Sequence, residues 1–360
     1  RYLDDGLSAQ EATSAALGRL EGAFALGIIF SGDDNLLIAA RRGSPLVIGW
    51  GSSAMYMGSD ALALAAFTNR VTYLRDGEWA CLNRAGATLF DSRGQKIEPK
   101  ISQTSHSAAQ VEKGEFPHYM LKEIFEQPTA IGETLNTYFN PAARTVQLPD
   151  MPFDLAGIPR ITIVACGTSH FAAMVARHWF EHRAGVPVDI DIASEFRYRE
   201  SRLAPGGLSI FVSQSGETID TLAALKYART QGQYVASIVN VVDSEMARES
   251  DVVFPTHAGP EIGVASTKAF TCQLVVLACL AIATGIARGA LSHEVEARLC
   301  RAIAEVPARA SEVLNHDDTI RSLAKEVALA QDVIYIGRGT SSAIALEGAL
   351  KLKEISYIHA

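Results

Sequence analysis

The sequence has no surplus of basic residues. Its 32 lysines and arginines stand against 40 aspartates and glutamates, which gives a net charge of −8. Surfaces that bind nucleic acid carry a basic excess or stripe, and no Lys/Arg block occurs here, so we expect no nucleic-acid partner. A local site for an anionic small molecule stays possible, because a few backbone amides can hold an anion within an acidic protein.

Cysteine is also scarce, and its five occurrences contain no Cys-x-x-Cys pair. That scatter argues against a disulfide framework and against a zinc site. No other metal-ligand spacing is evident, so we expect no metal and no cofactor. We interpret the five residues as buried thiols of a protein in the reducing cytoplasm: Cys81, Cys166, Cys272, Cys279 and Cys300.

Only one apolar run, at 269–287, is long enough to suggest a membrane span. Gln273 interrupts it, and its flanks show no asymmetry of basic residues. No signal-peptide pattern is present either. A buried helix in an α/β core is the favoured interpretation, and no membrane partner is expected.

The first hundred residues predict an antiparallel sheet. Ser8 and Glu11 have the spacing of a capping box for a short helix. Short apolar runs follow, separated by turn signals such as SGDDN and RDGE. The predicted strands are 24–30, 36–40, 45–50, 54–58, 71–74, 79–82 and 87–90.

The next sixty residues change character. Segment 101–116 is polar and poor in core residues, which is typical of a linker. Segment 118–135 predicts a helix interrupted at Pro128, because proline lacks the amide that a helix interior uses. Further prolines then predict an extended connection up to residue 160.

From residue 161 onward, apolar strands alternate with helices. This alternation indicates a parallel sheet that is covered on both faces. A strand–turn–helix unit at 162–181 recurs at 333–354, with the same Gly-Thr-Ser turn in both copies. We therefore expect two related α/β domains. The predicted strands of the first are 161–165, 186–192, 208–212, 234–241 and 251–256.

Three loops rich in hydroxyl groups follow the predicted strands: CGTS (166–169), SQSGET (213–218) and GVASTKAF (263–270). Ligands of open parallel sheets bind beyond the carboxyl ends of the strands, where helix N-termini favour phosphate. Gln214 can also bond sugar hydroxyls, and Gly216 permits a close backbone approach. The loops thus suggest a phosphorylated sugar or polyol, although serine and threonine at such junctions are also ordinary helix caps. Lys268 is assigned only to the first turn of the next helix.

Glu347, Lys351 and Glu354 are spaced so that they share one face of a helix. A solvated stripe of salt bridges is the commoner explanation of such a pattern. An acid, an amine and an acid together could also transfer protons between adjacent carbons. The stripe alone does not decide between the two.

Taken together, CGTS, SQSGET, EIGVASTKAF and LEGALKLKEISYIHA resemble the glutamine–fructose-6-phosphate aminotransferase (isomerizing) family, also called glucosamine-6-phosphate synthases. The resemblance covers nearly the whole chain and includes HYMLKEIFEQP and ASEFRYRES. SQSGE alone marks only the wider sugar-isomerase (SIS) superfamily, whereas the combination is more specific.

The resemblance implies an α/β protein with a β-rich, antiparallel tail of an N-terminal-nucleophile glutaminase domain, followed by SIS domains. Each SIS domain is a three-layer αβα sandwich with a parallel sheet. The implied divisions are the C-terminal part of a class II glutamine amidotransferase domain (1–103), a linker with a helix (104–156), a first SIS domain (157–295) and the start of a second (320–360).

The family uses ammonia, released from glutamine and passed through an internal channel, to convert fructose 6-phosphate to glucosamine 6-phosphate. Its members are homodimers. By resemblance, four residues hold the phosphate, three line the sugar site, and three carry the proton transfer. These are Ser213, Gln214, Ser215 and Thr218; Thr168, Val264 and Ser266; and Glu354 as the base, with Lys351 and Glu347 as its helpers at the sugar oxygens.

The chain also departs from the family pattern. It starts at Arg1 inside a helical pattern and stops at Ala360 just after another, so we expect a piece of a longer protein. The family's N-terminal cysteine nucleophile, its ring-opening histidine and its imine-forming lysine have no counterpart here. We expect this piece alone to be inactive. Two alternatives stay open: an SIS phosphosugar isomerase or deglycase, and a non-enzymatic module that binds sugar phosphates.

Overall fold

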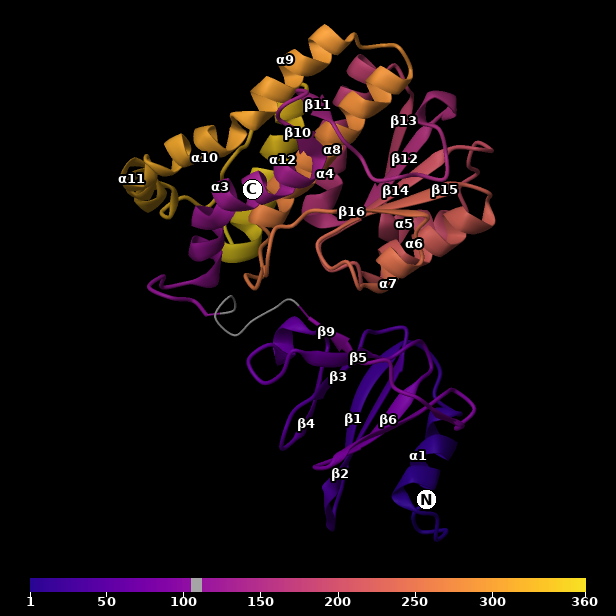
Figure 1. The fold of residues 1–360 in the computed structure, drawn as a ribbon. Helices are drawn as coiled ribbons and strands as arrows, with labels where there is room; N and C mark the ends of the chain where they lie inside the picture. The colour runs from indigo at the N-terminus through magenta and orange to yellow at the C-terminus, as the bar shows by residue number, and fades with distance from the viewer. Residues whose placement is uncertain (105–111) are drawn as a thin grey trace. The chain divides into compact units, whose positions relative to one another are not determined.

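The computed structural model describes residues 1–104 and 112–360. They form two compact units, Arg1–Gly114 and Glu115–Ala360, whose elements are labelled in Figure 1. The predicted linker 101–116 includes residues 105–111, which lie outside the described residues. Its first residues are not a linker, because Ser102–Gln103 form strand β9 and pair with β5.

The first unit contains two antiparallel sheets, ordered β1-β2-β6-β7-β8 and β4-β3-β5-β9. The predicted short helix is α1 (Ala9–Leu17), and the capping box between Ser8 and Glu11 is present. The strands are β1 (Phe24–Phe30), β2 (Asp33–Arg42), β3 (Val47–Trp50), β4 (Met55–Gly58), β5 (Arg70–Tyr73), β6 (Trp79–Asn83), β7 (Gly86–Phe90) and β8 (Lys96–Ile97). All seven predicted strands are therefore confirmed within a few residues.

Alternation along the strands builds the core of this unit. Ala39 of β2 and Ala80 of β6 face Ile48 of β3 in a cluster shared by the two sheets. The neighbouring residues on β2 point to the opposite face, where Ile38 and Leu17 of α1 form a second cluster. One sheet is thus sandwiched between the other sheet and a helix, as period-two alternation requires.

The second unit is built on a five-stranded parallel sheet, ordered β13-β12-β14-β15-β16. The strands are β12 (Ile161–Ala165), β13 (Val188–Ile192), β14 (Leu208–Ser213), β15 (Tyr234–Val239) and β16 (Val252–Pro255). Helices cover both faces: α4 (Gly167–Trp179) and α8 (Lys268–Ala287) on one, α5 (Ala193–Arg199), α6 (Ile219–Thr230) and α7 (Glu245–Arg248) on the other (Figure 1). The predicted three-layer arrangement is confirmed for this domain.

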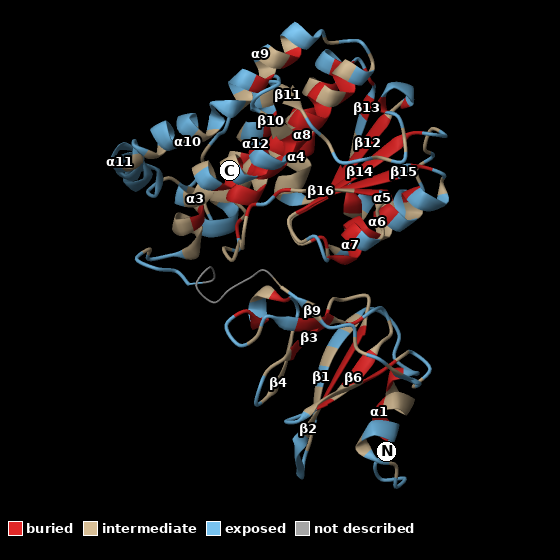
Figure 2. Cartoon of the chain, viewed as in Figure 1, coloured by how far each residue is buried: buried red, intermediate tan, exposed pale blue. Residues whose placement is uncertain are grey.

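The three central strands of this sheet, β12, β14 and β15, are buried on both sides almost throughout, as Figure 2 shows. Ile163 and Ile210 pack against α4 and α8, whereas Val164 and Phe211 pack against α5 and α6. A strand that is buried on both faces needs consecutive apolar residues. That is why ITIVA and LSIFV read as continuous runs rather than as alternating ones.

Helix α3 (Tyr119–Tyr138) runs through Pro128 without a break, so the predicted interruption is wrong. The proline leaves the carbonyl of Ile124 without its usual helical donor. The side-chain amide of Gln127 donates to that oxygen at 3.1 Å and replaces the lost bond. The helix then packs its apolar stripe, including Ile131 and Leu135, into the core beside α8.

The long apolar run forms α8, which has the length and composition of a membrane span, although 67% of its most apolar window is buried within the protein. It contacts α3 and α4, and Gln273 within it is buried. The burial agrees with the predicted core helix.

Three helices after α8 were not predicted: α9 (His293–Ala304), α10 (Val306–Leu314) and α11 (Asp317–Val327). The short hairpin of β10 (Phe139–Asn140) and β11 (Thr145–Val146) lies where we expected only an extended connection. Helix α12 (Thr340–Ser356) matches the repeated unit, but the strand expected before it does not form. Ile334 and Ile336 there are exposed, and among the described residues no strand lies alongside to bond their backbone groups.

Candidate functional site

A cavity of about 200 Å³ opens at the carboxyl ends of β12 and β14. The chain leaves β12 for α4 on one face of the sheet and leaves β14 for α6 on the other, which makes this the topological switch point where such sheets bind ligands. The lining is almost entirely small and polar. It consists of Cys166, Thr168, Ser169, Val212, Ser213, Gln214, Ser215, Thr218, Thr221 and Ser266.

Six of the seven predicted substrate-binding residues line this one cavity, although they come from three separate loops. The exception is Val264, which is not in the lining and whose side chain is fully exposed at the surface of its loop. The strand-end argument thus identified three segments that share one cavity, whereas Val264, which the resemblance implies, does not line it.

The turn in SQSGET depends on Gly216, which has a φ of 65°. A Cβ there would lie 2.0 Å from Oγ of Ser244, so both the backbone angle and the available space call for glycine. The carbonyl of Gly216 accepts the amide of Met246 at 3.1 Å, and its own amide donates to Oγ of Ser213 at 3.0 Å. The loop is therefore fixed before any ligand binds.

The hydroxyl groups of this loop do not cap the helix that follows. Thr218 is the N-cap residue of α6, but its side chain makes no capping bond. Instead its Oγ1 lies 2.9 Å from Oγ of Ser213. The first amides of α6 thus lack a side-chain acceptor from Thr218, and such amides are suited to an anion. This geometry favours the anion site over the simple cap.

The third loop is ordered around Glu261. Its carboxylate accepts the hydroxyl of Ser266 at 2.9 Å and the amides of Thr267 and Ala269 at 2.8 and 3.1 Å. The acid caps the start of α8 in place of Thr267, which makes no side-chain capping bond. Ser266 is thereby held in the wall of the cavity.

Lys351 contacts both of the other candidate catalytic residues of α12. Nζ of Lys351 lies 2.6 Å from Oε2 of Glu354 and 3.5 Å from Oε1 of Glu347. Glu347 is buried, and its Oε1 accepts the hydroxyl of Thr168 at 3.1 Å. These residues are therefore not only a salt-bridge network on the surface, because Glu347 contacts Thr168 in the cavity wall.

Burial raises the pKa of Glu347, while the charge of Lys351 and the bonds from Thr168 and Lys351 oppose that shift. Its Oε2 is buried and has no hydrogen-bond partner among the described residues. A buried carboxyl with an unused oxygen beside an amine can hold or pass a proton.

Asn240 is a structural residue of the site that the sequence analysis missed. Its Oδ1 accepts from Thr256 and from the amide of Ala258, its Nδ2 donates to the carbonyl of Gly259, and its amide donates to the carbonyl of Gln214. It therefore joins SQSGET to the segment that leads into the third loop. A polar residue just after the apolar strand YVASIV was the only available signal.

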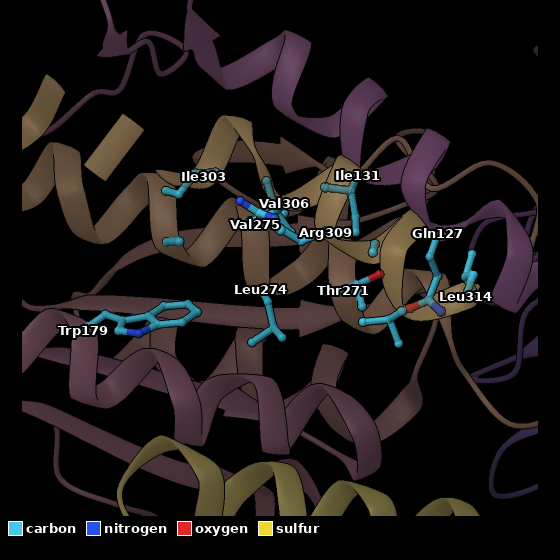
Figure 3. Close-up of a pocket in the computed structure, with 13 residues that line it drawn as sticks. Gln127, Ile131, Trp179, Thr271, Leu274, Val275, Ile303, Val306, Arg309 and Leu314 are labelled. Carbon is cyan, nitrogen blue, oxygen red and sulfur yellow. The ribbon is translucent and has the colours of Figure 1, made fainter. Parts of the chain in front are cut away.

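A larger hollow of about 520 Å³ lies elsewhere in this unit, between α3, α4, α8, α9 and α10. Figure 3 shows Trp179, Leu274 and Ile303 among the side chains around it. Its one charged lining residue, Arg309, is ion-paired with Glu305 and Glu312. Because the wall is mainly apolar, this hollow is poorly suited to a sugar phosphate.

Comparison with known proteins identifies the domain that contains this cavity. A family model described as the SIS domain matches residues 154–283, which include all the loops of the small polar cavity. A glutamine–fructose-6-phosphate aminotransferase (isomerizing) from Bradyrhizobium diazoefficiens is 55% identical over 97% of the chain, and one from Zymomonas mobilis is 54% identical over 99%. The chain spans 58% of the length of each of these relatives.

A solved structure is similar as well. The C-terminal domain of glucosamine-fructose-6-phosphate aminotransferase from Francisella tularensis superposes with a TM-score of 0.67 at 42% identity, over 69% of this chain and 70% of that one. Identity at this level over most of both chains, together with the SIS-type sheet, establishes the family. The chain belongs to the glutamine–fructose-6-phosphate aminotransferase (isomerizing) family.

Proposed function

We propose that this chain is part of an enzyme that makes glucosamine 6-phosphate and glutamate from fructose 6-phosphate and glutamine. Ammonia released from glutamine would pass through an internal channel to the sugar site. The names of the relatives from Bradyrhizobium diazoefficiens and Zymomonas mobilis state both substrates. Glutamine would be bound by the glutaminase part of the full-length protein.

In this proposal Ser213, Gln214, Ser215 and Thr218 hold the phosphate of the sugar. Their shared cavity and the uncapped start of α6 support the assignment, because hydroxyls and helix amides bind phosphate without a buried cation. Thr168, Val264 and Ser266 would line the sugar itself. Val264 would need to contact the substrate from its exposed position on the loop.

Glu354 is the proposed base, which moves a proton between C1 and C2 of the sugar. Lys351 and Glu347 would assist at the sugar oxygens. The 2.6 Å contact between Lys351 and Glu354 supports their acting together.

We further propose that Arg1–Gln103 belong to a class II glutamine amidotransferase domain, that residues 157–295 form the first SIS domain and that residues 320–360 begin a second. The two antiparallel sheets of the first unit support the first of these assignments. The repeated Gly-Thr-Ser turn and helix α12 support the last. The full-length enzyme would be a cytoplasmic homodimer.

One observation carries the proposal. The cavity of hydroxyl groups and the Glu–Lys–Glu helix are joined by the hydrogen bond from Thr168 to Glu347. A phosphate cradle and a proton-transfer set in contact are what an isomerising sugar-phosphate enzyme needs.

The test is the variant Glu354→Gln in the full-length protein. It should abolish glucosamine 6-phosphate formation but leave glutamine hydrolysis, because the amide cannot take a proton. Lys353→Gln, an exposed change on the same helix, is the control and should retain both activities. Synthesis at the normal rate by Glu354→Gln would show that the base is assigned wrongly.

The alternative of a phosphosugar isomerase without glutaminase makes a different prediction. Such an enzyme would convert fructose 6-phosphate without glutamine and would form no glucosamine 6-phosphate when glutamine is added. A binding module would turn over neither substrate. Product analysis of the full-length protein with each substrate alone and with both together separates the three cases.

A further inference from the structure

Glu123, in the first half of α3, makes a long-range contact with the third loop of the site. It is 2% exposed, and its Oε1 accepts the backbone amides of Ile262 at 2.5 Å and Gly263 at 2.9 Å. Its Oε2 is buried without a hydrogen-bond partner among the described residues. A carboxylate of one helix thus binds two adjacent amides of a distant loop.

Gly263 makes this contact possible. A Cβ at that position would lie 2.6 Å from Oε2 of Glu123 and 3.4 Å from the backbone of Met120. A larger residue would displace the carboxylate of Glu123 or push the loop away from α3. The loop therefore rests directly on the helix at this point.

An ion pair with α3, one turn further along that helix, holds the other end of the same loop. Lys268 is 3% exposed, and its Nζ lies 2.7 Å from Oε2 of Glu126. Lys268, which the sequence assigns only to the first turn of α8, is thus the buried partner of Glu126 on α3. Segment 262–268 is fixed at both ends by acids three residues apart on one helix.

Val264 and Ser266 lie between the amides bound by Glu123 and the ion pair of Lys268, and Ser266 lines the polar cavity. Glu261, immediately before the anchored amides, accepts the hydroxyl of Ser266. A displacement of Ile262 and Gly263 would therefore move Glu261 and, with it, the cavity wall.

We propose that Glu123 is a positioning residue of the sugar-phosphate site, which sets the third loop so that Ser266 faces the hydroxyl groups of SQSGET. The inference rests on the proposed function. Glu123 acts through Oε1 as an acceptor for two amides and does not touch the substrate. The role is one of geometry, so a neutral acceptor of the same shape should replace it.

The experiment compares Glu123→Ala and Glu123→Gln in the full-length protein. Glu123→Ala should raise KM for fructose 6-phosphate about tenfold, the size expected when the displaced loop loses one hydrogen bond between Ser266 and the substrate. The value of kcat should change less than twofold, because the loop binds the ground state and the transition state alike. Glu123→Gln keeps an acceptor oxygen for the two amides and should restore KM to within about threefold of wild type.

Glu296→Ala is the matched control. Glu296 is also a buried helical acid, and it accepts the backbone amide of Val146 at 3.1 Å, but it is not part of the cavity wall. Its loss should lower the melting temperature without changing KM. If Glu123→Ala leaves KM within twofold, or if Glu296→Ala raises KM equally, the positioning role is refuted.

Two further measurements keep the proposal testable if Glu123→Ala folds poorly or the proposed function fails. Gly263→Ala keeps the acid in the sequence but forces its carboxylate and the loop apart, and should also raise KM. Amide hydrogen exchange of residues 262–268, measured without substrate, should be at least about tenfold faster in Glu123→Ala than in wild type. Unchanged exchange would overturn the inference, whereas faster exchange in an enzyme that does not use fructose 6-phosphate would refute only the proposed function.

Discussion

The hydroxyl of Thr168 donates to Oε1 of Glu347 at 3.1 Å, across 179 positions of sequence. Thr168 lies in the first turn of α4, directly after β12, and Glu347 lies in α12, the helix of the second copy of the same unit. The two copies of the repeat therefore meet side by side, and α12 packs against α4. This contact turns two separate sequence patterns into one candidate site.

The double variant Ser215→Ala, Thr218→Ala should raise KM for fructose 6-phosphate in the full-length protein. Each lost bond to a phosphate oxygen is worth about 1.5–3 kcal/mol, so the loss of two should raise KM at least about a hundredfold. Steady-state kinetics measures it. Ser292→Ala removes a true capping hydroxyl at the start of α9 and should leave KM unchanged. If the double variant also leaves KM unchanged, the two hydroxyls do not bind the phosphate and only stabilise the fold.

Gly216→Ala should destabilise the chain more than Gly232→Ala. Both glycines have positive φ, 65° and 71°, and the left-handed backbone costs an L-residue about 1–2 kcal/mol. A Cβ on Gly232 meets nothing within 4 Å, whereas one on Gly216 would lie 2.0 Å from Ser244. The clash should add about 1–3 kcal/mol. Urea unfolding of both variants gives the difference, and equal losses would show that Ser244 simply moves aside.

Glu347→Gln should change how the free energy of unfolding depends on pH. Burial raises the folded pKa of Glu347 above its ordinary value of 4.5, so the folded state keeps this proton to higher pH than the unfolded state. The associated stability is fully present below 4.5 and is lost as pH rises through the folded pKa. The variant cannot ionise, so its stability relative to wild type should rise from pH 4.5 towards pH 8.

Glu326→Gln, at an exposed position, is the reference for that series and should show no such trend. Thermal unfolding of the three proteins at several pH values supplies the comparison. If the unfolding free energies of Glu347→Gln and wild type differ by the same amount at every pH, the pKa of Glu347 is not raised by folding.

Cys166 should be the thiol that reacts fastest with a disulfide reagent at pH 8. It lines the polar cavity, while burial raises the pKa of Cys272 and Cys279 to about 12 and that of Cys81 and Cys300 to about 11. The thiolate is the reactive form. Fructose 6-phosphate should slow this reaction in the full-length protein, and Cys166→Ser should remove it. A fast reaction that persists in Cys166→Ser would contradict the assignment.

Much of the fold could be predicted because the local signals agree with the final packing. ITIVA and LSIFV are apolar apart from Thr162 and Ser209, since both faces of their sheet are covered, and each is followed directly by small residues. SQSGET was correctly placed beyond a strand end. Whether its hydroxyls cap the following helix could not be predicted from the sequence. Only the folded structure shows that Thr218 bonds to Ser213 rather than to the helix amides.

The errors come from interactions that are distant in sequence or specific to one side chain. Pro128 does not break α3 because Gln127 supplies the missing donor. Segment 333–337 has strand-like residues, but a strand also needs a neighbour. Glu123 stood inside a recognised motif, yet its bonds to Ile262 and Gly263 cross more than half the second unit's sequence and leave no local pattern.

A crystal structure of the full-length protein with fructose 6-phosphate bound tests the proposed site most directly. The proposed site predicts the phosphate in the polar cavity, with its oxygens within about 3 Å of the hydroxyls of Ser215 and Thr218 and of the first amides of α6, and the sugar carbons pointing towards Glu354. A phosphate bound outside this cavity, or a sugar oriented away from α12, would contradict it.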